Sequence, residues 1–441
     1  MKSSAKPLLS FLSLLFISSF TYAGQYYALC EGNFGQANSS VWSINEDLTA
    51  LEGPIELNGN SYWGDVGQSL VQYRNRLYAI MNNSHEIHYI DPTMGFPPNA
   101  SLNLQGASPR YMAVDGQSGL GYVSCWNLSA ILIIDLDHLT VLDTFNLGKL
   151  PEQMIIHNDM LFVSIPLQED WSTENEVLQI DISNPEPVLA HTYEVIEGPG
   201  AMALYNQELY VTSIYYNDAW ETFSGTSRIN LVDQSVTTMD HGLYPNFTAD
   251  IQIIDTSAYR TFGNAIVPLN EDLTLNTESA IGNISGIYTF SVHNNMVFIG
   301  STDFIAPDLV SVISLDGQEL ASFNVGALPS QIVYYSTDIS TTDEFIEVPA
   351  VFSLGHNYPN PFNPSTSIPF SLEKSGSVRL SIYDIRGVIV TTLIDEHLAA
   401  GSYISNWNGT NASGKAVSSG IYHGILKSNS QSRSIKLNLI K

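Results

Sequence analysis

The chain has 441 residues, and its 44 acidic side chains outnumber 16 basic ones, giving a formal net charge of −28. A surface this acidic repels phosphate backbones, which argues against a nucleic-acid-binding protein. The two cysteines form no C-x-x-C pair, so redox and zinc chemistry have no support in the sequence.

The N-terminal segment, residues 1–23, has the pattern of a secretory signal peptide. Lys2 and Lys6 form the charged start, residues 8–20 the apolar stretch, and Thr21-Tyr22-Ala23 the small-residue cleavage site. The apolar stretch is too short for a spanning helix, and no later segment reaches the roughly 18 apolar residues that one needs. We therefore expect a secreted mature chain that begins near Gly24 and has no transmembrane segment.

Residues 24–335 repeat one pattern about seven times. Each copy runs from a Gly-x-x-Pro-like turn through an apolar strand, a strand that opens on Leu-Tyr or its equivalent, and a strand that closes on Ile-Asp. The turn prolines, with Ser285 in place of one, are 42, 48, 46, 40 and 44 residues apart. A period in the low forties with four short strands per unit is typical of a β-propeller blade.

The ends of this region predict how the ring closes. We expect seven innermost strands, at residues 66–72, 110–114, 152–157, 200–205, 247–253, 286–292 and 330–335. The last has no downstream partners, whereas residues 26–30, 40–45 and 48–57 have no innermost strand before them. We predict that these segments complete the seventh blade together, which removes an exposed sheet edge. Cys30 and Cys125 then fall one blade apart, and we expect two separate buried residues. The fifth unit, residues 246–282, matches the pattern least well.

Two enlarged loops on neighbouring blades are the leading candidates for a binding site. Residues 165–175 contain Glu169, Asp170 and Trp171, and residues 214–226 contain Tyr216, Asp218 and Trp220. Each loop sets an indole beside carboxylates, which suits stacking on a flat ligand or sugar while its polar edge is held. Loops on a rigid scaffold vary freely, so this face is the expected binding surface.

Other candidates are expected on the same rim. They are Phe34, Tyr62, Trp63, Asp65, Arg110, Tyr111, Trp126, Tyr244 and Asp303. The alternative is that the aromatic residues fill the space between blades. Arg110 has two readings as well: it pairs locally with acids, or it orients an anionic group of a ligand.

Several acidic and histidine residues could be interpreted as metal ligands or catalytic groups, but simpler explanations exist for them. Acids that close the third strands, such as Asp91 and Asp135, start turns by bonding their own backbone. His85 and His88 would face opposite sides of a strand and so cannot share a zinc ion. The sequence contains no nucleophile-elbow, P-loop, dinucleotide-binding or calcium-loop motif. We predict no cofactor, but an enzyme stays open, because propeller hydrolases and lyases assemble their sites from separate blades.

The C-terminal part of the chain differs in character. Residues 336–354 form a polar, acidic linker, and residues 357–366 carry three prolines, which forbid a helix or central strand. Alternating segments then follow at residues 378–383, 388–393, 402–407 and 420–426, and they predict a small antiparallel sandwich. Charge is divided unevenly: residues 24–351 hold six basic and 40 acidic residues, and residues 352–441 hold eight and four.

The C-terminal region resembles a known family. Three motifs and a final lysine-containing strand resemble the C-terminal sorting domain of type IX secretion substrates. The motifs are NYPNPFNPST, VRLSIYDIRG and AGSYISNWNGTNASGKAVSSGIY. The resemblance covers nearly all of residues 355–441. It implies an Ig-like sandwich, recognition by the type IX secretion machinery, and export to the outer-membrane surface or medium of a Gram-negative bacterium.

The propeller resembles a second family, most strongly over residues 26–148. The words YALCEGNFG, GDVGQSL, NNS and SPRYM resemble surface propellers of the YVTN, YncE-like class. Some members of that class bind corrinoids, so the resemblance adds a corrinoid to the ligands considered, but it transfers no binding residue.

The sequence thus predicts an all-β chain with a seven-bladed propeller at residues 24–335 and an Ig-like sandwich at residues 355–441. We expect a secreted, surface-displayed protein that binds a small molecule, a glycan or a surface protein without catalysis. Two alternatives remain: an extracellular lyase or lactonase that uses a divalent metal such as Ca²⁺, and a structural surface-layer protein. The sequence does not identify the ligand, the oligomeric state or cleavage of the sorting domain.

Overall fold

The fold is all-β. The computed structural model describes residues 24–57, 59–92, 101–184, 186–304, 307–336, 353–354, 357, 362–372, 376–398, 401–428 and 431–440. Within these residues the chain forms strands joined by turns, with one short 3-10 helix, η1 (Thr277–Ser279). That part of the chain holds no helix long and apolar enough to cross a bilayer. The predicted signal peptide and nearly all of the predicted linker lie outside the described residues.

Seven antiparallel sheets form the propeller, and each is one blade. Blade 1 contains β4 (Gly67–Tyr73), β5 (Arg76–Met81), β6 (Glu86–Ile90) and β7 (Ser101–Asn103); blade 2 contains β8 (Pro109–Asp115), β9 (Leu120–Cys125), β10 (Ala130–Asp135) and β11 (Thr140–Asn146). Blade 3 contains β12 (Lys149–Leu150), β13 (Met154–His157), β14 (Met160–Gln168), β15 (Thr173–Asp181) and β16 (Val188–Glu194); blade 4 contains β17 (Pro199–Tyr205), β18 (Glu208–Tyr216), β19 (Thr222–Asn230) and β20 (Val236–Leu243).

The remaining blades follow the same plan with two exceptions. Blade 5 has three strands, β21 (Ile251–Ile254), β22 (Ser257–Phe262) and β23 (Ala265–Pro268), and blade 6 contains β24 (Ile287–His293), β25 (Met296–Ser301), β26 (Asp308–Ser314) and β27 (Glu319–Val325). Blade 7 joins β28 (Pro329–Tyr335) to β1 (Gln25–Cys30), β2 (Ser40–Asn45) and β3 (Leu51–Glu52).

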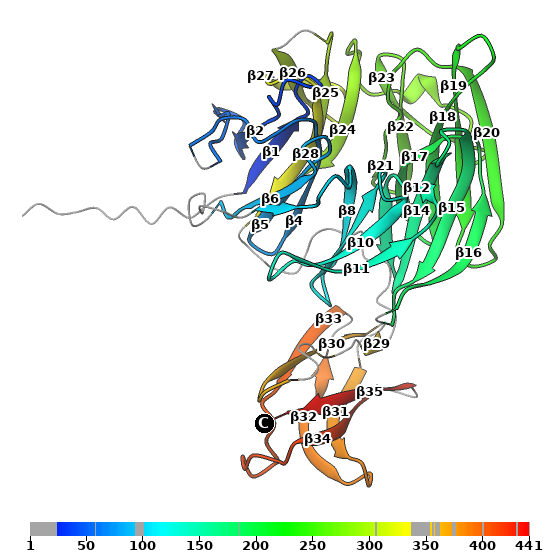
Figure 1. Cartoon of the computed structure of the whole chain (residues 1–441). Helices are drawn as coiled ribbons and strands as arrows, with labels where there is room; N and C mark the ends of the chain where they lie inside the picture. Colours follow the sequence, from blue (N-terminus) through cyan, green and yellow to red (C-terminus); the bar gives the residue numbers. More distant parts are fainter. Residues whose placement is uncertain are drawn as a thin grey trace, which may run out of the picture.

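Blade 7 confirms the predicted closure. β1 pairs with β28 antiparallel from Gln25↔Tyr335 to Cys30↔Pro329, and it pairs with β2 on its other side. Figure 1 shows the blue N-terminal strand β1 beside the yellow strand β28. The two ends of the ring are therefore held in one sheet, as the unpartnered first and last segments of the repeat predicted.

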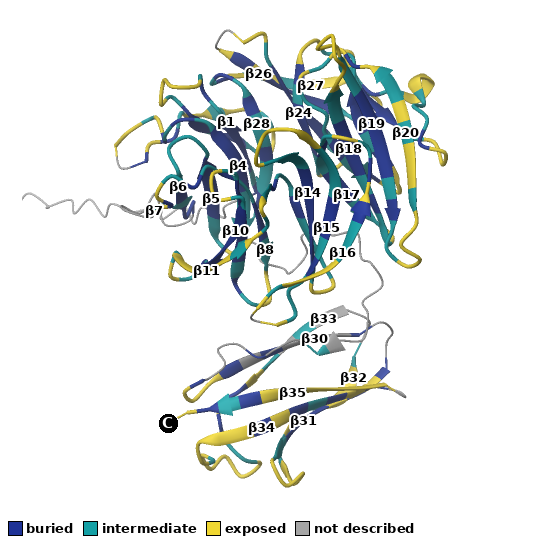
Figure 2. Cartoon of the chain, turned by 45° about the vertical axis from the view of Figure 1, so that its right-hand side comes forward, coloured by how far each residue is buried: buried dark blue, intermediate teal, exposed yellow. Residues whose placement is uncertain are grey.

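Apolar packing joins each blade to the next. β-branched and aromatic residues on the second and third strands face a neighbouring sheet, as their β-propensity favours. One cluster, for example, joins Tyr78 and Ile80 of blade 1 to Met112 and Val123 of blade 2. Figure 2 shows buried residues in dark blue on the inner strands, while the outer strands β11, β16 and β20 carry the exposed residues.

A bulge in the inner strand recurs in several blades, and a side chain from the preceding blade completes its hydrogen bonding. The register shifts near the start of β4, β17 and β24. The N–H of Leu70, just past one bulge, donates to Gln331 Oε1 at 2.8 Å, and the N–H of Phe290 donates to Asp250 Oδ2 at 3.2 Å. Because an unpaired buried N–H costs roughly 1–3 kcal/mol, these contacts tie neighbouring blades together.

Blade 5 is the irregular unit, which agrees with its poor match to the repeat. Its inner strand is four residues long, and isolated bridges (Ile266↔Ile281 and Leu269↔Leu275) stand where a fourth strand would be. Arg260 of β22 is fully buried against blade 4, where it donates to the Gly225 carbonyl, Thr226 Oγ1 and Ser224 Oγ.

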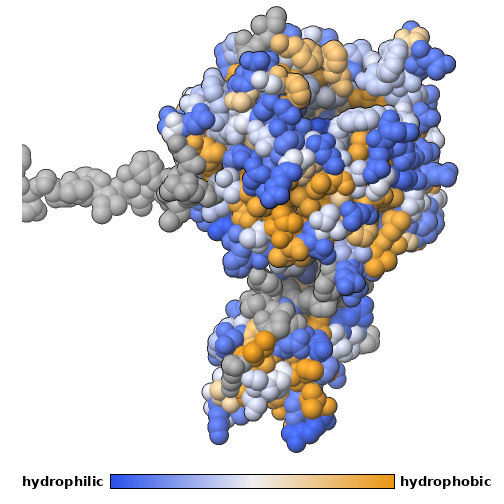
Figure 3. Space-filling model, in the orientation of Figure 1, coloured by the Kyte–Doolittle hydropathy of each residue, from blue (hydrophilic) through white to orange (hydrophobic). Residues whose placement is uncertain are grey.

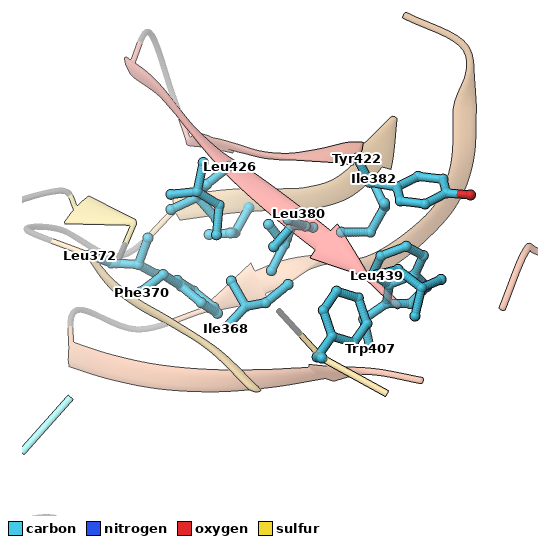
Figure 4. Close-up of a cluster of buried hydrophobic side chains, with 13 residues drawn as sticks. Ile368, Phe370, Leu372, Leu380, Ile382, Trp407, Tyr422, Leu426 and Leu439 are labelled. Atoms are coloured by element: carbon cyan, nitrogen blue, oxygen red, sulfur yellow. The ribbon is translucent and has the colours of Figure 1, made fainter. Parts of the chain in front are cut away.

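The C-terminal strands form two sheets that enclose their own core. One sheet contains β29 (Ser353–Leu354), β30 (Thr366–Leu372) and β33 (Gly401–Trp407), and the other β32 (Ile389–Leu398), β31 (Gly376–Asp384), β34 (Gly420–Ser428) and β35 (Gln431–Leu439). Side chains from both sheets meet between them, among them Trp407, Leu380 and Leu426 (Figure 4). This confirms the predicted sandwich.

Both cysteines are free and buried, as expected, and burial raises the pKa of each thiol to about 12. They are packing residues.

Candidate functional site

The candidate loops meet on one face of the ring. In each antiparallel pair the second strand ends where the inner strand begins, as at Cys125↔Pro109, Ser213↔Pro199 and Ser301↔Ile287. Loops that leave the second strands and loops that enter the inner strands therefore share this face, which we call the top face.

Trp171 occupies the tip of the β14–β15 hairpin. Its N–H donates to the Gln168 carbonyl at 3.0 Å, and Asp170 accepts hydrogen bonds from the N–H and hydroxyl of Ser172. The Ser172 hydroxyl lowers the pKa of Asp170, so this carboxylate stabilises the turn. The indole is 63% exposed and lies edge-on against Trp126, with ring centroids 5.6 Å apart.

Trp220 occupies the equivalent tip of the β18–β19 hairpin. Asn217 Oδ1 accepts from the N–H groups of Ala219 and Glu221, which closes the turn, and Asp218 is exposed beside it. The indole is 82% exposed and lies 6.2 Å from the Tyr216 ring. Trp171 and Trp220 thus stand in two separate aromatic pairs on neighbouring blades.

Exposed aromatic residues continue around the top face. We call this set the aromatic rim: Phe34, Tyr62, Trp171, Tyr216, Trp220, Phe247 and Phe304 are between 45% and 82% exposed. They come from six blades or the loops that enter them. Four further exposed apolar residues lie on outer strands: Val141 and Leu142 on β11, and Val188 and Leu189 on β16. Figure 3 shows orange side chains gathered over this outer region of the propeller.

Three rim residues have a left-handed backbone conformation, which other turn residues such as Leu139 and Leu273 share. Trp171, Trp220 and Phe304 have φ values of 67°, 60° and 67°, in the left-handed region. Each sits in the loop after a second strand. That conformation costs an L-residue with a bulky side chain roughly 1–2 kcal/mol, whereas Gly or Asn adopts it readily. Bulky aromatic residues therefore hold strained, exposed positions where a small residue would fold more easily.

Arg110 pairs locally, which was one of its two predicted readings. Its guanidinium makes a two-pronged ion pair with Glu152, at 2.9 and 2.6 Å, and also donates to Gln68 Oε1 at 2.6 Å. It lies 4.1 Å from the centroid of Trp126. Burial acts to lower the pKa of Arg110, but the Glu152 carboxylate outweighs it and raises this pKa. Arg110 thereby supports Trp126, which in turn packs against Trp171.

Glu152 and Tyr288 were missed by the sequence reasoning, although the repeat holds a signal for them. The register aligns Gln68, Arg110, Glu152, Tyr288 and Ser330, each of which directly follows the first residue of the inner-strand motif. Equivalent positions in a ring face a common axis, so charged residues there are expected to meet.

Glu31, which follows β1, joins the same group, and we call Glu31, Gln68, Arg110, Tyr111, Glu152 and Tyr288 the axial cluster. Tyr288 donates its hydroxyl proton to Glu31 Oε1 at 2.9 Å. Burial is the largest effect on Glu31 and raises its pKa to about 7. The Tyr288 hydroxyl and the Arg110 guanidinium act to lower this pKa, whereas the Glu152 carboxylate acts to raise it. Burial likewise raises the pKa of Tyr111, whose charge neighbours include Glu152 and Arg110.

Three candidates are corrected by the structure. Trp63 is only 3% exposed, and its indole N–H donates to the Ile55 carbonyl at 2.8 Å, so it packs between blades and does not reach a ligand. Asp65 is buried and accepts hydrogen bonds from the Gly35 N–H and from Asn83, which fixes the loop that carries Phe34. Tyr244 is also buried, and its hydroxyl donates to the Thr248 carbonyl.

Among the described residues, no group of three or more His, Cys, Asp and Glu side chains is arranged to hold a metal ion. The acids of the axial cluster are instead engaged with Arg110 and Tyr288.

Comparison with known proteins supports the architecture. A family model described as FlgD Ig-like domain matches residues 363–432. Among solved structures, a protein from Lactobacillus plantarum is similar at 12% identity with a TM-score of 0.54, covering 71% of this chain and 99% of that one. A Bacteroides fragilis protein, described provisionally as a 6-phosphogluconolactonase, has 13% identity, a TM-score of 0.49 and coverages of 72% and 99%. Among curated proteins no match was found. At these identities the likeness concerns the fold alone: a β-propeller followed by an Ig-like domain.

The axial cluster predicts a pH dependence of stability. Because the pKa of Glu31 is raised in the folded state from 4.5 to about 7, its contribution is fully present below pH 4.5 and is lost as pH rises through 7. The loss is on the order of 3 kcal/mol. Glu31→Gln should therefore gain stability relative to the wild type between pH 5 and pH 8.

Thermal unfolding of both proteins across this range measures the difference. Tyr288, Arg110 and Glu152, the groups that face Glu31, are present in both proteins, so the comparison isolates the change at Glu31. A stability difference that stays constant from pH 5 to pH 8 would contradict the raised pKa.

Proposed function

We propose that this protein is a secreted, surface-displayed binding propeller that captures its ligand on the aromatic rim without catalysis. The carrying observation is the strained placement of Trp171, Trp220 and Phe304. Leaving a large apolar side chain in water forgoes about 1.5–3 kcal/mol of burial, and the left-handed backbone adds a further cost. Strain of this kind concentrates at functional sites, where binding restores the loss.

The support beneath the rim also fits a binding role. Trp171 lies against Trp126, which lies under the Arg110 guanidinium, and Arg110 is held by Glu152. This chain of contacts fixes the orientation of one rim residue before a ligand arrives, which lowers the entropy lost on binding. The acidic propeller favours ligands that are neutral or cationic.

The proposed route to the surface rests on the C-terminal region. Its Ig-like sandwich, the preceding proline-rich words and the N-terminal secretory pattern together fit a type IX secretion substrate. Within the proline-rich segment, residues 358–361 lie outside the described residues. The propeller's resemblance to the YncE-like class keeps a corrinoid among the ligands to be tested.

The alternative function is an extracellular metal-dependent lyase or lactonase. It would require three or more oxygen ligands converging near the axis, and the acids found there pair with Arg110 and Tyr288. A structural surface-layer role is the second alternative, and the strained, exposed rim argues against it, because a surface without a ligand gains nothing from such residues.

The rim predicts that binding and stability respond oppositely to one substitution. Trp171→Asn/Trp220→Asn should lose ligand binding at least tenfold, while its melting temperature stays the same or rises, because Asn relieves the left-handed strain. The ligand is found first by a thermal-shift screen of the mature chain against cyanocobalamin, neutral oligosaccharides and CaCl₂.

The matched control is Val232→Asn, since Val232 is 76% exposed in the β19–β20 turn at the opposite end of blade 4. A large fall in melting temperature of the double variant would show that the indoles serve packing. No shift with any probe would favour the structural role.

Export provides a separate prediction. In a bacterium with a type IX system, the full chain should become accessible to externally added protease, whereas a chain truncated after residue 354 should remain in the periplasm with its propeller folded. Surface exposure of the truncated chain would contradict the assignment of residues 355–441 as the sorting domain.

A further inference from the structure

A pocket opens on the top face at the seam between blades 5 and 6. It has a volume of about 220 Å³, and its walls come from the loop before β21, the β22–β23 turn, and the loops before and after the first two strands of blade 6. Phe247 and Phe304 form its lip, one from each blade, with ring centroids 4.8 Å apart and an edge-to-face angle of 79°. Two members of the aromatic rim thus frame a concave site.

The irregularity of blade 5 explains why the pocket lies here. Its inner strand starts only at Ile251, so residues 245–250 form a loop on the top face. The adjacent loop is held close by Gly286, whose φ is +70° and where a Cβ would lie 2.3 Å from the Thr302 carbonyl oxygen. This glycine lets the two loops of blade 6 that line the pocket approach each other closely.

Hydrogen bonds fix the walls before any ligand arrives. The Asn246 side chain donates to the Gly263 carbonyl at 2.7 Å and accepts from the Gly263 N–H at 2.8 Å. Thr302 donates its hydroxyl proton to Asp308 at 2.8 Å and accepts from the Phe304 N–H at 2.8 Å. The pocket is thus preorganised, which favours a specific ligand.

The lining carries aromatic rings, amides and hydroxyls, and no charged side chain. Asn264 and Ser285 are exposed at the pocket, and their side chains make no hydrogen bond to another residue within the described part of the chain. Tyr288 contributes its ring, while its hydroxyl proton goes to Glu31. An amide and a hydroxyl beside aromatic faces match a molecule with an apolar face and hydroxyl groups around its edge.

We infer that this pocket binds one neutral sugar ring, and this inference rests on the proposed function. The volume lies below the roughly 300–1,000 Å³ of a site for a drug-sized ligand, so it takes a single ring rather than an extended chain. The ring's C–H face packs on Phe247 or Phe304, and its hydroxyl groups reach Asn264 and Ser285. The strongly acidic propeller disfavours an anionic sugar.

The test uses the mature full-length chain and ligand-observed saturation-transfer NMR, which detects weak binding. The probes are the methyl glycosides of glucose, galactose, mannose and N-acetylglucosamine, with glucuronate as the anionic comparison and cyanocobalamin as an unrelated ligand. We expect transfer to at least one neutral glycoside and at least tenfold weaker transfer to glucuronate. Phe247→Ala/Phe304→Ala should abolish the neutral signal.

The control variant is Leu142→Ala/Val232→Ala, which removes the same number of exposed apolar side chains away from the top face and should keep the signal. Asn264→Ala, a milder change in an exposed side chain, should weaken binding and leave the melting temperature unchanged. Together these variants separate loss of the pocket from loss of folding.

The outcomes distinguish this inference from the proposed function. A neutral-sugar signal that survives Phe247→Ala/Phe304→Ala but is lost in Trp171→Asn/Trp220→Asn would overturn the pocket and leave the binding role intact. Binding of cyanocobalamin or glucuronate without any neutral glycoside would overturn the sugar class. Silence with every probe would count against both.

Discussion

The pairing of β28 with β1 is the constraint on which the rest of the structure depends. These strands lie about 300 residues apart in sequence, and six register pairs join them at the inner side of blade 7. Without this pairing β28 would present an open sheet edge, a template for aggregation, and blades 6 and 1 would lose the sheet between them. With it, residues of blades 1, 2, 3, 6 and 7 reach one another near the axis, as Arg110, Glu152 and Tyr288 do through the axial cluster.

Closure also determines where variation is tolerated. Inner-strand bulges are tied to neighbouring blades by Gln331 and Asp250, so the inner strands are fixed by two partners at once. The hairpin tips on the top face are not fixed between two blades in this way. They can hold Trp171 and Trp220 in strained, exposed positions because the ring beneath supplies enough stability to bear it. The binding role proposed for the rim thus depends on a rigid ring that supports exposed hairpin tips.

Much of this fold could be predicted from the sequence, because each blade repeats the same strands and turns. The repeat predicted the seven blades, the closure and the irregular fifth unit. The repeat also located the Trp171 and Trp220 loops, since length and composition set them apart.

The prediction of site residues failed at Trp63 and Asp65, because a short segment before an inner strand does not show which side chains turn inward. Arg110 and Glu152 occupy the same repeat position in successive blades, so their ion pair was readable once register was known. The burial of Arg260 could not be predicted, because its partners Ser224 and Thr226 are small polar residues that form no recognisable sequence pattern. The pocket could not be predicted from the sequence either, because it arises where blade 5 departs from the repeat.

Hydrogen exchange in β1 and β28 tests the central claim, the closed ring, most directly. Mass spectrometry would follow peptides that cover Gln25–Cys30 and Pro329–Tyr335, with Leu120–Cys125 of β9 as an internal reference. In a closed ring β1 lies between β28 and β2, as β9 lies between β8 and β10, so the amides of β1 should exchange as slowly as those of β9. The amides of β28 that pair with β1 should become labelled together with those of β1 as denaturant is added. Rapid exchange of β1 while β9 stays protected would mean that the N-terminal strand is not part of the ring, and the account would be wrong.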